Sequence, residues 1–381
     1  MIRRTLEPDS MSRRVLLVKR SILSSSTSKN AVESTIGIRD VAAAAGVSIS
    51  TVSNVLNGHD RRMRPDTKQR VLDAIERLSY RPSAIARQFR TGQTRTIGLV
   101  VPSVANPFWG AMAHQIERAA MSAGYGVLFC NAERDVAAEK RYAEMLLTSG
   151  VRGVILGSSP LSFEPFADLA RQGLIIAAFD RSPPYADGIV ACSASIDNQL
   201  AGRLAAQHLI GLGHRRIGFI SGPIRTASRL ARLEGIRDAL GRTGLELDPA
   251  LLWQGPLSHG YGDAEGSELG RIAIREMLSL ENPPTAVMTI NDMYALGCLA
   301  GARDLGYSVP GDLSLVGFDD LTLAAIASPP LTTIRQPLEL LAQNLVRGLI
   351  ARLEGKTEGV THYQAVPEFL VRASTGEPRG V

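Results

Sequence analysis

Short apolar runs alternate with helix-length segments between residues 97 and 318 of this 381-residue chain. Runs of this kind predict buried parallel strands, and strands separated by helices form right-handed βαβ units. Their number predicts an α/β body of two doubly wound lobes. The runs are IGLVV (97–101), VLFC (127–130), GVIL (153–156), IIAAF (175–179), IGFI (217–220), AVMTI (286–290) and LSLVGF (313–318).

A different pattern precedes the strands. A helix predicted over 39–45 is followed by Gly46, where a left-handed backbone costs glycine little, and by a second helix with Ser48 as its N-cap. This is the pattern of a helix-turn-helix. Val52 belongs to the buried face of the second helix, which leaves its N-terminal end exposed, where such helices meet base edges. The candidates for base contact are Ile49, Ser50, Thr51, Ser53 and Asn54.

The N-terminal part is also strongly basic. Residues 1–92 carry 17 Lys/Arg against 8 Asp/Glu, a net charge of +9, whereas the whole chain has +5. Arg61, Arg62 and Arg64 lie in the loop before a third helix, which is predicted from Pro65 to about residue 78 with Val71, Leu72, Ile75 and Leu78 on its apolar face. We expect the three arginines to contact DNA phosphates, so that binding depends on salt. A solvated charge cluster is the alternative.

Several segments together resemble the LacI/GalR family of transcriptional regulators. The resemblance begins with DVAAAAGVSISTVSNVLNG and YRPSAIARQF and continues, in order, nearly to the end of the chain. It implies an all-α helix-turn-helix DNA-binding domain joined by a hinge helix to an α/β, two-lobed, periplasmic-binding-protein-like domain. The later segments are TRTIGLVVPSVANPFW, LIGLGHRRIGFISGP, RLEGIRDAL, NDMYALG, VPGDLSLVGFDD and PPLTTIRQP.

The hinge expected from this resemblance covers only Ser83 to Phe89, which is too short for a stable isolated helix. In the family, two such segments meet in the DNA minor groove, and an apolar side chain from each enters between base pairs. Phe89 stands at that wedge position, where leucine is usual, and Ala86 and Arg87 are candidates for groove contact. A linker in which Phe89 packs on the body is the alternative.

The resemblance also sets the expected domain boundaries. Residues 1–35 are expected to be a disordered basic extension, and no heptad repeat follows the last predicted strand, so a homodimer is favoured over a coiled-coil tetramer. The domains are residues 36–81 (helix-turn-helix), 82–94 (hinge helix and linker) and 95–375 (effector binding and dimerisation), with lobe 1 at about 95–194 and 323–353 and lobe 2 at about 195–322 with the tail.

Candidate effector-binding residues follow the predicted strands, because ligands of open α/β sheets bind at the carboxyl ends of strands. Together they supply aromatic faces, hydrogen-bond acceptors and guanidinium donors, which suit sugar hydroxyls or a small heterocycle. The candidates are Phe108, Trp109, Asn131, Asp180, Arg181, Ser228, Arg232, Asn291 and Asp319.

Structural alternatives stand beside the functional ones. Asp319 could cap a helix, Arg232 could be an ordinary surface residue, and Phe108 or Trp109 could belong to the core. Asp319 and Arg232 match family positions that contact effector. Asp292 is expected to be an N-cap, and Asn198 to support the crossover between lobes.

Composition excludes other classes of protein. The chain is 45% hydrophobic and 21% charged, without an apolar run long enough to span a bilayer. Cys130, Cys192 and Cys298 are widely separated, so neither a disulfide framework nor a zinc site is indicated, and a reducing cytoplasm is expected. We expect no cofactor, no metal and no enzymatic activity, because no catalytic constellation emerges.

The expected function is a sequence-specific DNA-binding transcriptional regulator, favoured as a repressor, that binds a pseudo-palindromic operator and is controlled by a small effector. A sugar or sugar derivative is favoured as effector. The alternatives are a purine-like corepressor and, from another class of protein, a solute-binding protein. Asn54 replaces the arginine common in the family, and its amide suits adenine.

Overall fold

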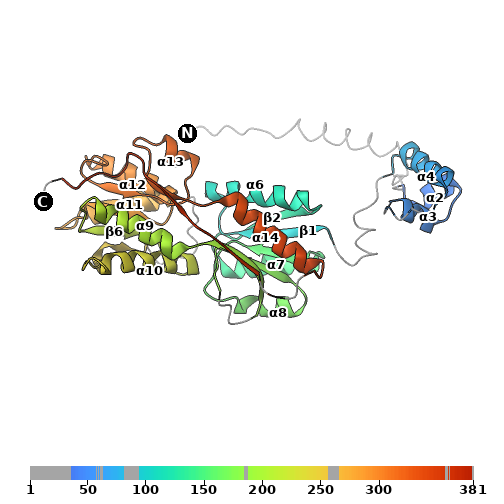
Figure 1. Ribbon diagram of the computed structural model, residues 1–381, viewed down its shortest axis with the longest axis horizontal. Helices are drawn as coiled ribbons and strands as arrows, with labels where there is room; N and C mark the ends of the chain where they lie inside the picture. The colour runs from blue at the N-terminus through green and yellow to red at the C-terminus, as the bar shows by residue number, and fades with distance from the viewer. Residues whose placement is uncertain are drawn as a thin grey trace, which may run out of the picture. The chain divides into compact units, whose positions relative to one another are not determined.

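The computed structural model describes residues 36–56, 58, 60, 63–80, 94–183, 188–255, 266–356, 359 and 361–379. The chain divides into two compact units, an N-terminal helical unit and a body that contains the strands (Figure 1). The expected basic extension, the hinge with Ala86, Arg87 and Phe89, and the loop arginines Arg61 and Arg62 lie outside the described residues.

In the described residues of the N-terminal unit, the helices are α2 (Ile38–Ala45), α3 (Ile49–Leu56) and α4 (Pro65–Arg77). The turn between α2 and α3 has Gly46 at φ 63°, and the Ser48 hydroxyl accepts a hydrogen bond from the Thr51 amide at 3.2 Å. The core contains Val52 and Val71. Both the turn and the N-cap confirm the predicted helix-turn-helix.

One prediction about α4 was wrong. Leu72 was expected on the buried face, but it is 40% exposed, and the buried residues of this helix are Val71 and Ala74. A spacing of three residues puts Val71 and Ala74 on one face, and Leu72 lies about 100° further around the helix.

The first lobe of the body contains a six-stranded parallel sheet in the order β11-β5-β4-β3-β1-β2. Helices α6 and α14 pack with one hydrophobic cluster of this lobe. Its strands are β1 (Thr96–Val101), β2 (Gly126–Asn131), β3 (Gly153–Leu156), β4 (Ile175–Phe179), β5 (Val190–Ile196) and β11 (Thr361–Ala365), and its helices are α6 (Pro107–Ser122), α7 (Val136–Thr148), α8 (Ala167–Arg171), preceded by the turn η1 (Glu164–Phe166), and α14 (Leu338–Leu353).

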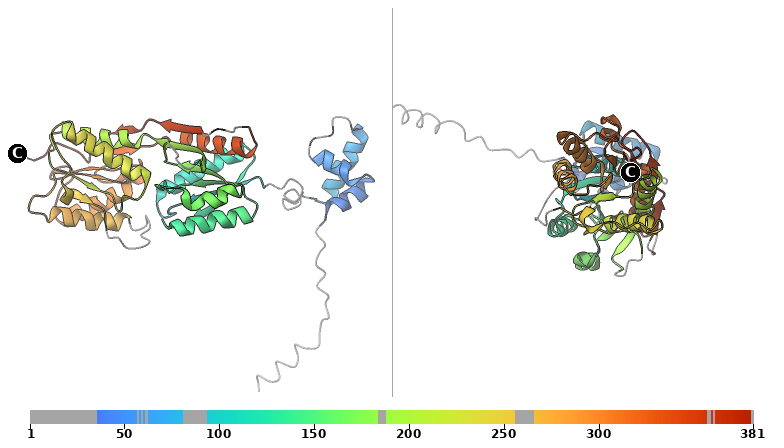
Figure 2. Two further views of the ribbon diagram at one scale, coloured as in Figure 1. Left: turned by 90° about the horizontal axis from the view of Figure 1, so that it is seen from below. Right: turned by 90° about the vertical axis from the view of Figure 1, so that its left-hand side faces the viewer.

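The second lobe contains a four-stranded parallel sheet in the order β7-β6-β8-β9. Helices α9 and α10 cover one face and α11 and α12 the other, as the two side views show (Figure 2). The strands are β6 (Ile217–Ile220), β7 (Leu252–Trp253), β8 (Ala286–Thr289) and β9 (Ser314–Val316), and the helices are α9 (Asn198–Gly211), α10 (Ala227–Gly241), η2 (Pro249–Leu251), α11 (Gly266–Leu278), α12 (Asp292–Asp304) and α13 (Thr322–Ile326).

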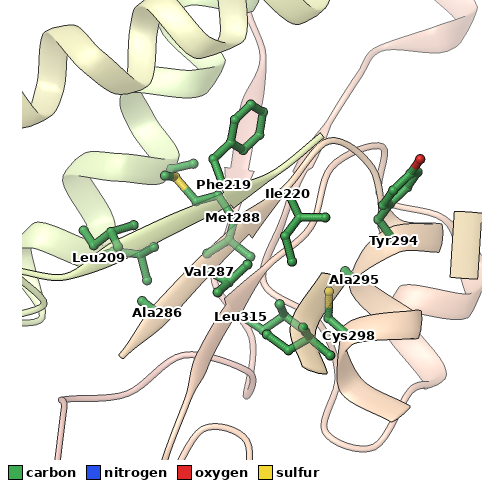
Figure 3. Packing of buried hydrophobic residues seen from close by; sticks show 14 of the residues in the cluster. Leu209, Phe219, Ile220, Ala286, Val287, Met288, Tyr294, Ala295, Cys298 and Leu315 are labelled. Atoms are coloured by element: carbon green, nitrogen blue, oxygen red, sulfur yellow. The ribbon is translucent and has the colours of Figure 1, made fainter. Parts of the chain in front are cut away.

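The core of the second lobe fixes these helices against the sheet. Phe219 and Met288 lie on adjacent strands, with Leu209 of α9 on one side and Cys298 of α12 on the other (Figure 3). Helices α9 and α10 touch backbone to backbone, since a Cβ added to Gly235 would lie 1.9 Å from the Gln199 carbonyl oxygen. The two helices therefore form one rigid pair.

The chain crosses between the lobes more than once, and the structure places some of the lobe boundaries elsewhere than expected. Ala324 of α13 belongs to the core of the second lobe, and β11 belongs to the sheet of the first. The expected return to lobe 1 at residue 323 is therefore too early, and its expected end at residue 353 leaves out a strand. A separate antiparallel pair of β10 (Thr333–Arg335) and β12 (Glu368–Leu370) accompanies the crossing segments.

The expectation that every apolar run is a buried strand was wrong for β2. This strand forms an edge of the first sheet, where Leu128 is 47% and Phe129 is 44% exposed. An apolar run alone cannot distinguish an edge strand from a central one. Within the described segments, no helix has the length and apolar character needed to cross a membrane.

Candidate functional site

The carboxyl ends of the two parallel sheets face a cleft between the lobes. Its inner part is a cavity of about 70 Å³, to which each lobe contributes polar and aromatic side chains. Seven of the nine predicted effector residues line it: Phe108, Trp109, Asp180, Ser228, Arg232, Asn291 and Asp319.

A chain of hydrogen bonds joins the lobes at this cavity. Asp180 follows β4 with φ 55°, and its Oδ1 accepts a hydrogen bond from Asn198 Nδ2 at 2.5 Å. Arg232 Nε donates to Asn198 Oδ1 at 2.8 Å, and Arg232 Nη2 lies 3.5 Å from Asp180 Oδ2. Asn198, expected only to support the crossover, therefore contacts both charged residues.

Arg232 is a buried residue and not an ordinary surface arginine. Its guanidinium carbon lies 3.4 Å from the centre of the Phe318 ring, and Nη1 donates to the Ile290 carbonyl at 2.8 Å. Burial lowers the pKa of Arg232, and the carboxylates of Asp180 and Asp319 oppose this shift. Arginine nevertheless stays protonated in proteins, so the cavity contains a fixed positive charge between two acidic residues.

Asp319 pairs with a residue that the sequence reasoning missed. Gln336 Nε2 donates to Asp319 Oδ1 at 2.7 Å, while Gln336 Oε1 is buried without a hydrogen-bond partner in the described part of the chain. Gln336 directly follows β10, so the strand-end rule could have found it if that short strand had been recognised. Asp319 does not cap α13, whose N-cap is Leu321.

The aromatic wall serves the core and the cavity together. Phe108, Trp109 and Phe179 pack against one another, with centroids 5.2 Å apart for Phe108–Trp109 and 5.4 Å for Trp109–Phe179. A Cβ at Gly157 would lie 2.5 Å from the Trp109 ring, so only glycine leaves room for the indole. Phe108 and Trp109 are therefore core residues that also line the cavity.

The N-cap of α12 is Asn291 and not Asp292, which corrects the expectation. Asn291 Oδ1 accepts from the Tyr294 amide at 3.0 Å. Asp292 is the first helical residue, and its carboxylate accepts from the Leu321 amide at 2.8 Å and the Thr333 hydroxyl at 2.7 Å. Burial raises the pKa of Asp292 to about 7.

A larger outer chamber of about 900 Å³ adjoins the cavity. Asn131 lies there and accepts a hydrogen bond from the Val104 amide, whereas Arg181 donates to the Leu161 carbonyl and lines neither space. Burial raises the pKa of Glu139, another residue of this chamber, to about 7. The sequence reasoning missed the residues that both spaces share: Pro102, Arg134, Ser158, Thr226 and Arg229.

The lobes touch where these two spaces meet. The Ala227 amide of the second lobe donates to the Ser159 carbonyl of the first at 3.0 Å, beside an antiparallel bridge between Pro160 and Thr226. The Ser159 hydroxyl in turn donates to the Asp180 carbonyl at 2.6 Å. These contacts hold the cleft closed around a cavity smaller than the roughly 300–1,000 Å³ of typical ligand sites.

The exposed end of α3 carries the predicted base-contact residues. Ile49, Ser50 and Asn54 are exposed, and Thr51 and Ser53 are partly buried. The hydroxyl of Ser48 also lies 2.7 Å from that of Ser50 and 2.8 Å from that of Thr51, which orders the start of the helix. Arg64 is exposed at the N-terminus of α4.

A helix-turn-helix and a two-lobed body with a polar interlobe cleft are the parts of a ligand-controlled DNA-binding regulator. Known proteins agree with this class. Residues 37–83 match the family described as bacterial regulatory proteins, lacI family, and residues 206–375 match a periplasmic binding protein-like domain. The chain is 35% identical to the HTH-type transcriptional repressor PurR of Aliivibrio salmonicida (strain LFI1238), covering 88% of this chain and 98% of that protein.

Further relatives extend the match. The HTH-type transcriptional regulator DegA of Bacillus subtilis (strain 168) is 34% identical over 89% of this chain and 97% of its own length. Among solved structures, the lac repressor dimer bound to operator and the anti-inducer ONPF has a TM-score of 0.75 and 29% identity, covering 90% of this chain and 99% of that one. A transcriptional regulator CelR–cellobiose complex has a TM-score of 0.66 and 31% identity, covering 89% and 99%.

This chain belongs to the lacI family of bacterial regulatory proteins. It is a DNA-binding transcriptional regulator with the family's helix-turn-helix and periplasmic-binding-protein-like domains.

Proposed function

We propose that the protein is a dimeric repressor whose operator affinity is set by a sugar or sugar derivative bound in the interlobe cleft. The observation that carries the proposal is the buried set of Asp180, Asn198 and Arg232, in which each lobe contributes charge to one cavity. Carboxylates accept from sugar hydroxyls, and a guanidinium donates to them, so one hydroxyl can bond with both groups.

The closed cleft fits control by lobe movement. The cavity of about 70 Å³ is too small for a whole sugar, so an effector must separate the lobes at the contact between Ser159 and Ala227 to enter. A ligand that favours one lobe arrangement shifts the population of the two arrangements. Operator binding then changes only because the arrangements differ in DNA affinity.

The names of relatives support a sugar over a purine. One related structure is a complex with cellobiose, and another, 26% identical, contains bound ribose. A purine-like ligand is the second candidate, because the aromatic rings of Phe108 and Trp109 line the cavity. The two rings pack edge to face, which already uses part of their surface and leaves less for stacking.

Thermal-shift screening tests the effector class. The full chain is mixed with monosaccharides, disaccharides, polyols, phosphosugars and purines, and its melting temperature is measured. A saturable rise with one compound class identifies the effector, because a ligand of the native state stabilises it by mass action. Stabilisation by purines alone would contradict the sugar proposal, and a compound of the identified class then enters the DNA-binding measurements.

For DNA, we propose that α3 reads base edges through Ile49, Ser50, Thr51, Ser53 and Asn54. The exposed amide of Asn54 can bond with the N6 and N7 atoms of adenine. Arg61, Arg62 and Arg64 are assigned to phosphates, and Ala86, Arg87 and Phe89 to the minor groove. Two heads of a dimer require two half-sites related by pseudo-twofold symmetry.

A further inference from the structure

The side-chain amide of Asn198 lies between charged residues of the two lobes. Its Nδ2 donates to Asp180, at the end of β4 in the first lobe, and its Oδ1 accepts from Arg232, on α10 of the second. The three residues are 6%, 6% and 8% exposed, so solvent screens their interactions little. The amide therefore connects the lobes through two short hydrogen bonds.

The direct contact between the two charges is weaker. Arg232 Nη2 and Asp180 Oδ2 are 3.5 Å apart, whereas charge-assisted hydrogen bonds measure about 2.7–2.9 Å. A ligand hydroxyl near this gap would meet a carboxylate and a guanidinium together. It would also compete with Asn198, because the same two groups are its partners.

The position of Asn198 in the chain gives this competition a mechanical consequence. Asn198 is the first residue of α9, two residues after β5 ends at Ile196, where the chain crosses from the first lobe to the second. The backbone contact at Gly235 fixes α9 against α10. Asn198 and Arg232 therefore move together as part of the second lobe. Any movement of this lobe changes their contacts with Asp180 of the first lobe.

We propose that Asn198 is the positioning residue that couples occupation of the cleft to lobe closure. The inference rests on the proposed function, because it takes Asp180 and Arg232 as effector contacts. In the ligand-free protein, Asn198 is hydrogen-bonded to Asp180, and this bond keeps the lobes closed. When an effector hydroxyl takes over Asp180, the amide loses that partner, and the lobes are then joined through the effector instead of through Asn198.

The Ala227 amide is a built-in reporter of closure. It donates across the cleft to the Ser159 carbonyl at 3.0 Å, and it lies outside α9 and away from Asn198 in sequence. Hydrogen exchange at this amide requires the lobes to part, whereas exchange at Leu209, in the middle of the second-lobe core, requires α9 itself to open.

Hydrogen–deuterium exchange of the full chain, without DNA or effector, tests the proposal. In Asn198→Asp, a carboxylate faces the Asp180 carboxylate, and the repulsion should open the cleft. The expected result is exchange at least tenfold faster at Ala227, with exchange at Leu209 within twofold of the wild type. Unchanged exchange at Ala227, or equal acceleration at both amides, would overturn the proposal, since the second outcome marks a purely structural role.

A swap variant provides the matched rescue. Asp180→Asn combined with Asn198→Asp exchanges the amide and the carboxylate, so their hydrogen bond is kept and Arg232 retains an acceptor. Exchange at Ala227 should return to within threefold of the wild type. If Asn198→Asp does not fold, the swap variant decides alone: a folded protein with a protected Ala227 supports the proposal, and any other outcome overturns it. No effector is used, so failure here leaves the proposed function to its own tests.

Discussion

Arg232 combines three contacts that no other residue type could make together: hydrogen bonds to Asn198 and to the Ile290 carbonyl, and a cation–π contact with Phe318. A planar guanidinium with five donors allows this, and the aromatic face supports the charge where water is excluded. At the scale of single residues, the effector site is organised around this side chain.

Replacing Arg232 by methionine should weaken effector binding by roughly 10- to 100-fold, because charge-assisted hydrogen bonds contribute about 1.5–3 kcal/mol. Calorimetric titration with the compound found by thermal-shift screening measures the change. Arg237→Met, on the exposed face of the same helix, is the matched control and should bind as the wild type does. Equal affinity in the Arg232 variant would contradict the assignment.

Asn54→Ala should relax operator preference at one base pair, because only base contacts distinguish sequences. Arg62→Ala should instead weaken binding to all sequences. It should also lower the slope of log K against log salt concentration by about 1, which corresponds to one lost phosphate contact. Binding isotherms with a set of single-base operator variants at two salt concentrations separate these effects. A uniform loss across operators for Asn54→Ala would remove it from base reading.

Ionisation of the buried Asp292 carboxyl should lower the free energy of unfolding as pH rises. Its pKa is raised to about 7 in the folded chain, so the folded state keeps a proton that the unfolded state releases from about pH 4 upward. The destabilising contribution is absent below about pH 4 and complete above about pH 7. The unfolding free energy of Asp292→Asn minus that of the wild type should therefore be larger at pH 8 than at pH 5.

Denaturant unfolding at the two pH values measures this gain. The variant must be compared with the wild type because other buried groups also titrate. The pKa of Glu139 is raised to about 7, and burial lowers the pKa of His208, His214 and His362. Those groups titrate in both proteins, so the difference isolates Asp292. An equal difference at pH 5 and pH 8 would contradict the raised pKa.

The rule that ligand-binding residues follow parallel strands found most residues of the site. It missed several residues that hydrogen-bond to them or lie beside them. Asp180, Arg232 and Asp319 follow apolar runs or match a family segment, so position in the sequence was enough to select them. Gln336 follows a strand of only three residues, and no sequence pattern indicates that Arg229 is buried. The hydrogen bonds of Asn198 depend on lobe closure, which no local pattern encodes.

At the level of elements, the edge strand β2 carries exposed apolar side chains. Its Leu128 and Phe129 are exposed, and an edge strand also presents unpaired backbone groups. The apolar runs predicted seven strands of the two sheets, namely β1, β2, β3, β4, β6, β8 and β9, but they did not indicate β5, β7 or β11, whose segments carry more polar residues or are very short. They could not predict strand order, because order depends on contacts between segments far apart in the chain.

We propose that β2 forms part of the dimer interface, and Phe129→Asp should then produce monomers. A buried charge at a subunit contact is costly without a partner, and a monomer also loses the second DNA half-site. Sedimentation velocity measures the change in assembly, and operator binding should fall with it. Met145→Asp on α7 is the control, since Met145 is similarly exposed, at 48%, but belongs to a helix and not to the edge strand. A dimeric Phe129→Asp protein would exclude β2.

At the scale of the whole molecule, two sites with different ligands share one chain. Thermodynamic linkage requires that an effector which changes operator affinity by some factor has its own affinity changed by the operator by the same factor. Because the sign depends on which lobe arrangement favours DNA, both induction and corepression satisfy this relation.

Allosteric control is tested most directly by an operator-binding titration with and without saturating effector, followed by effector titration with and without operator. DNA comes from the promoter region next to the protein's own coding sequence, and the compound from thermal-shift screening. Linkage between the two sites should change the operator dissociation constant at least fivefold and the dissociation constant of the compound by the same factor, and both changes should be lost in Arg232→Met. An operator affinity unaffected by a compound that saturates the cleft would contradict it.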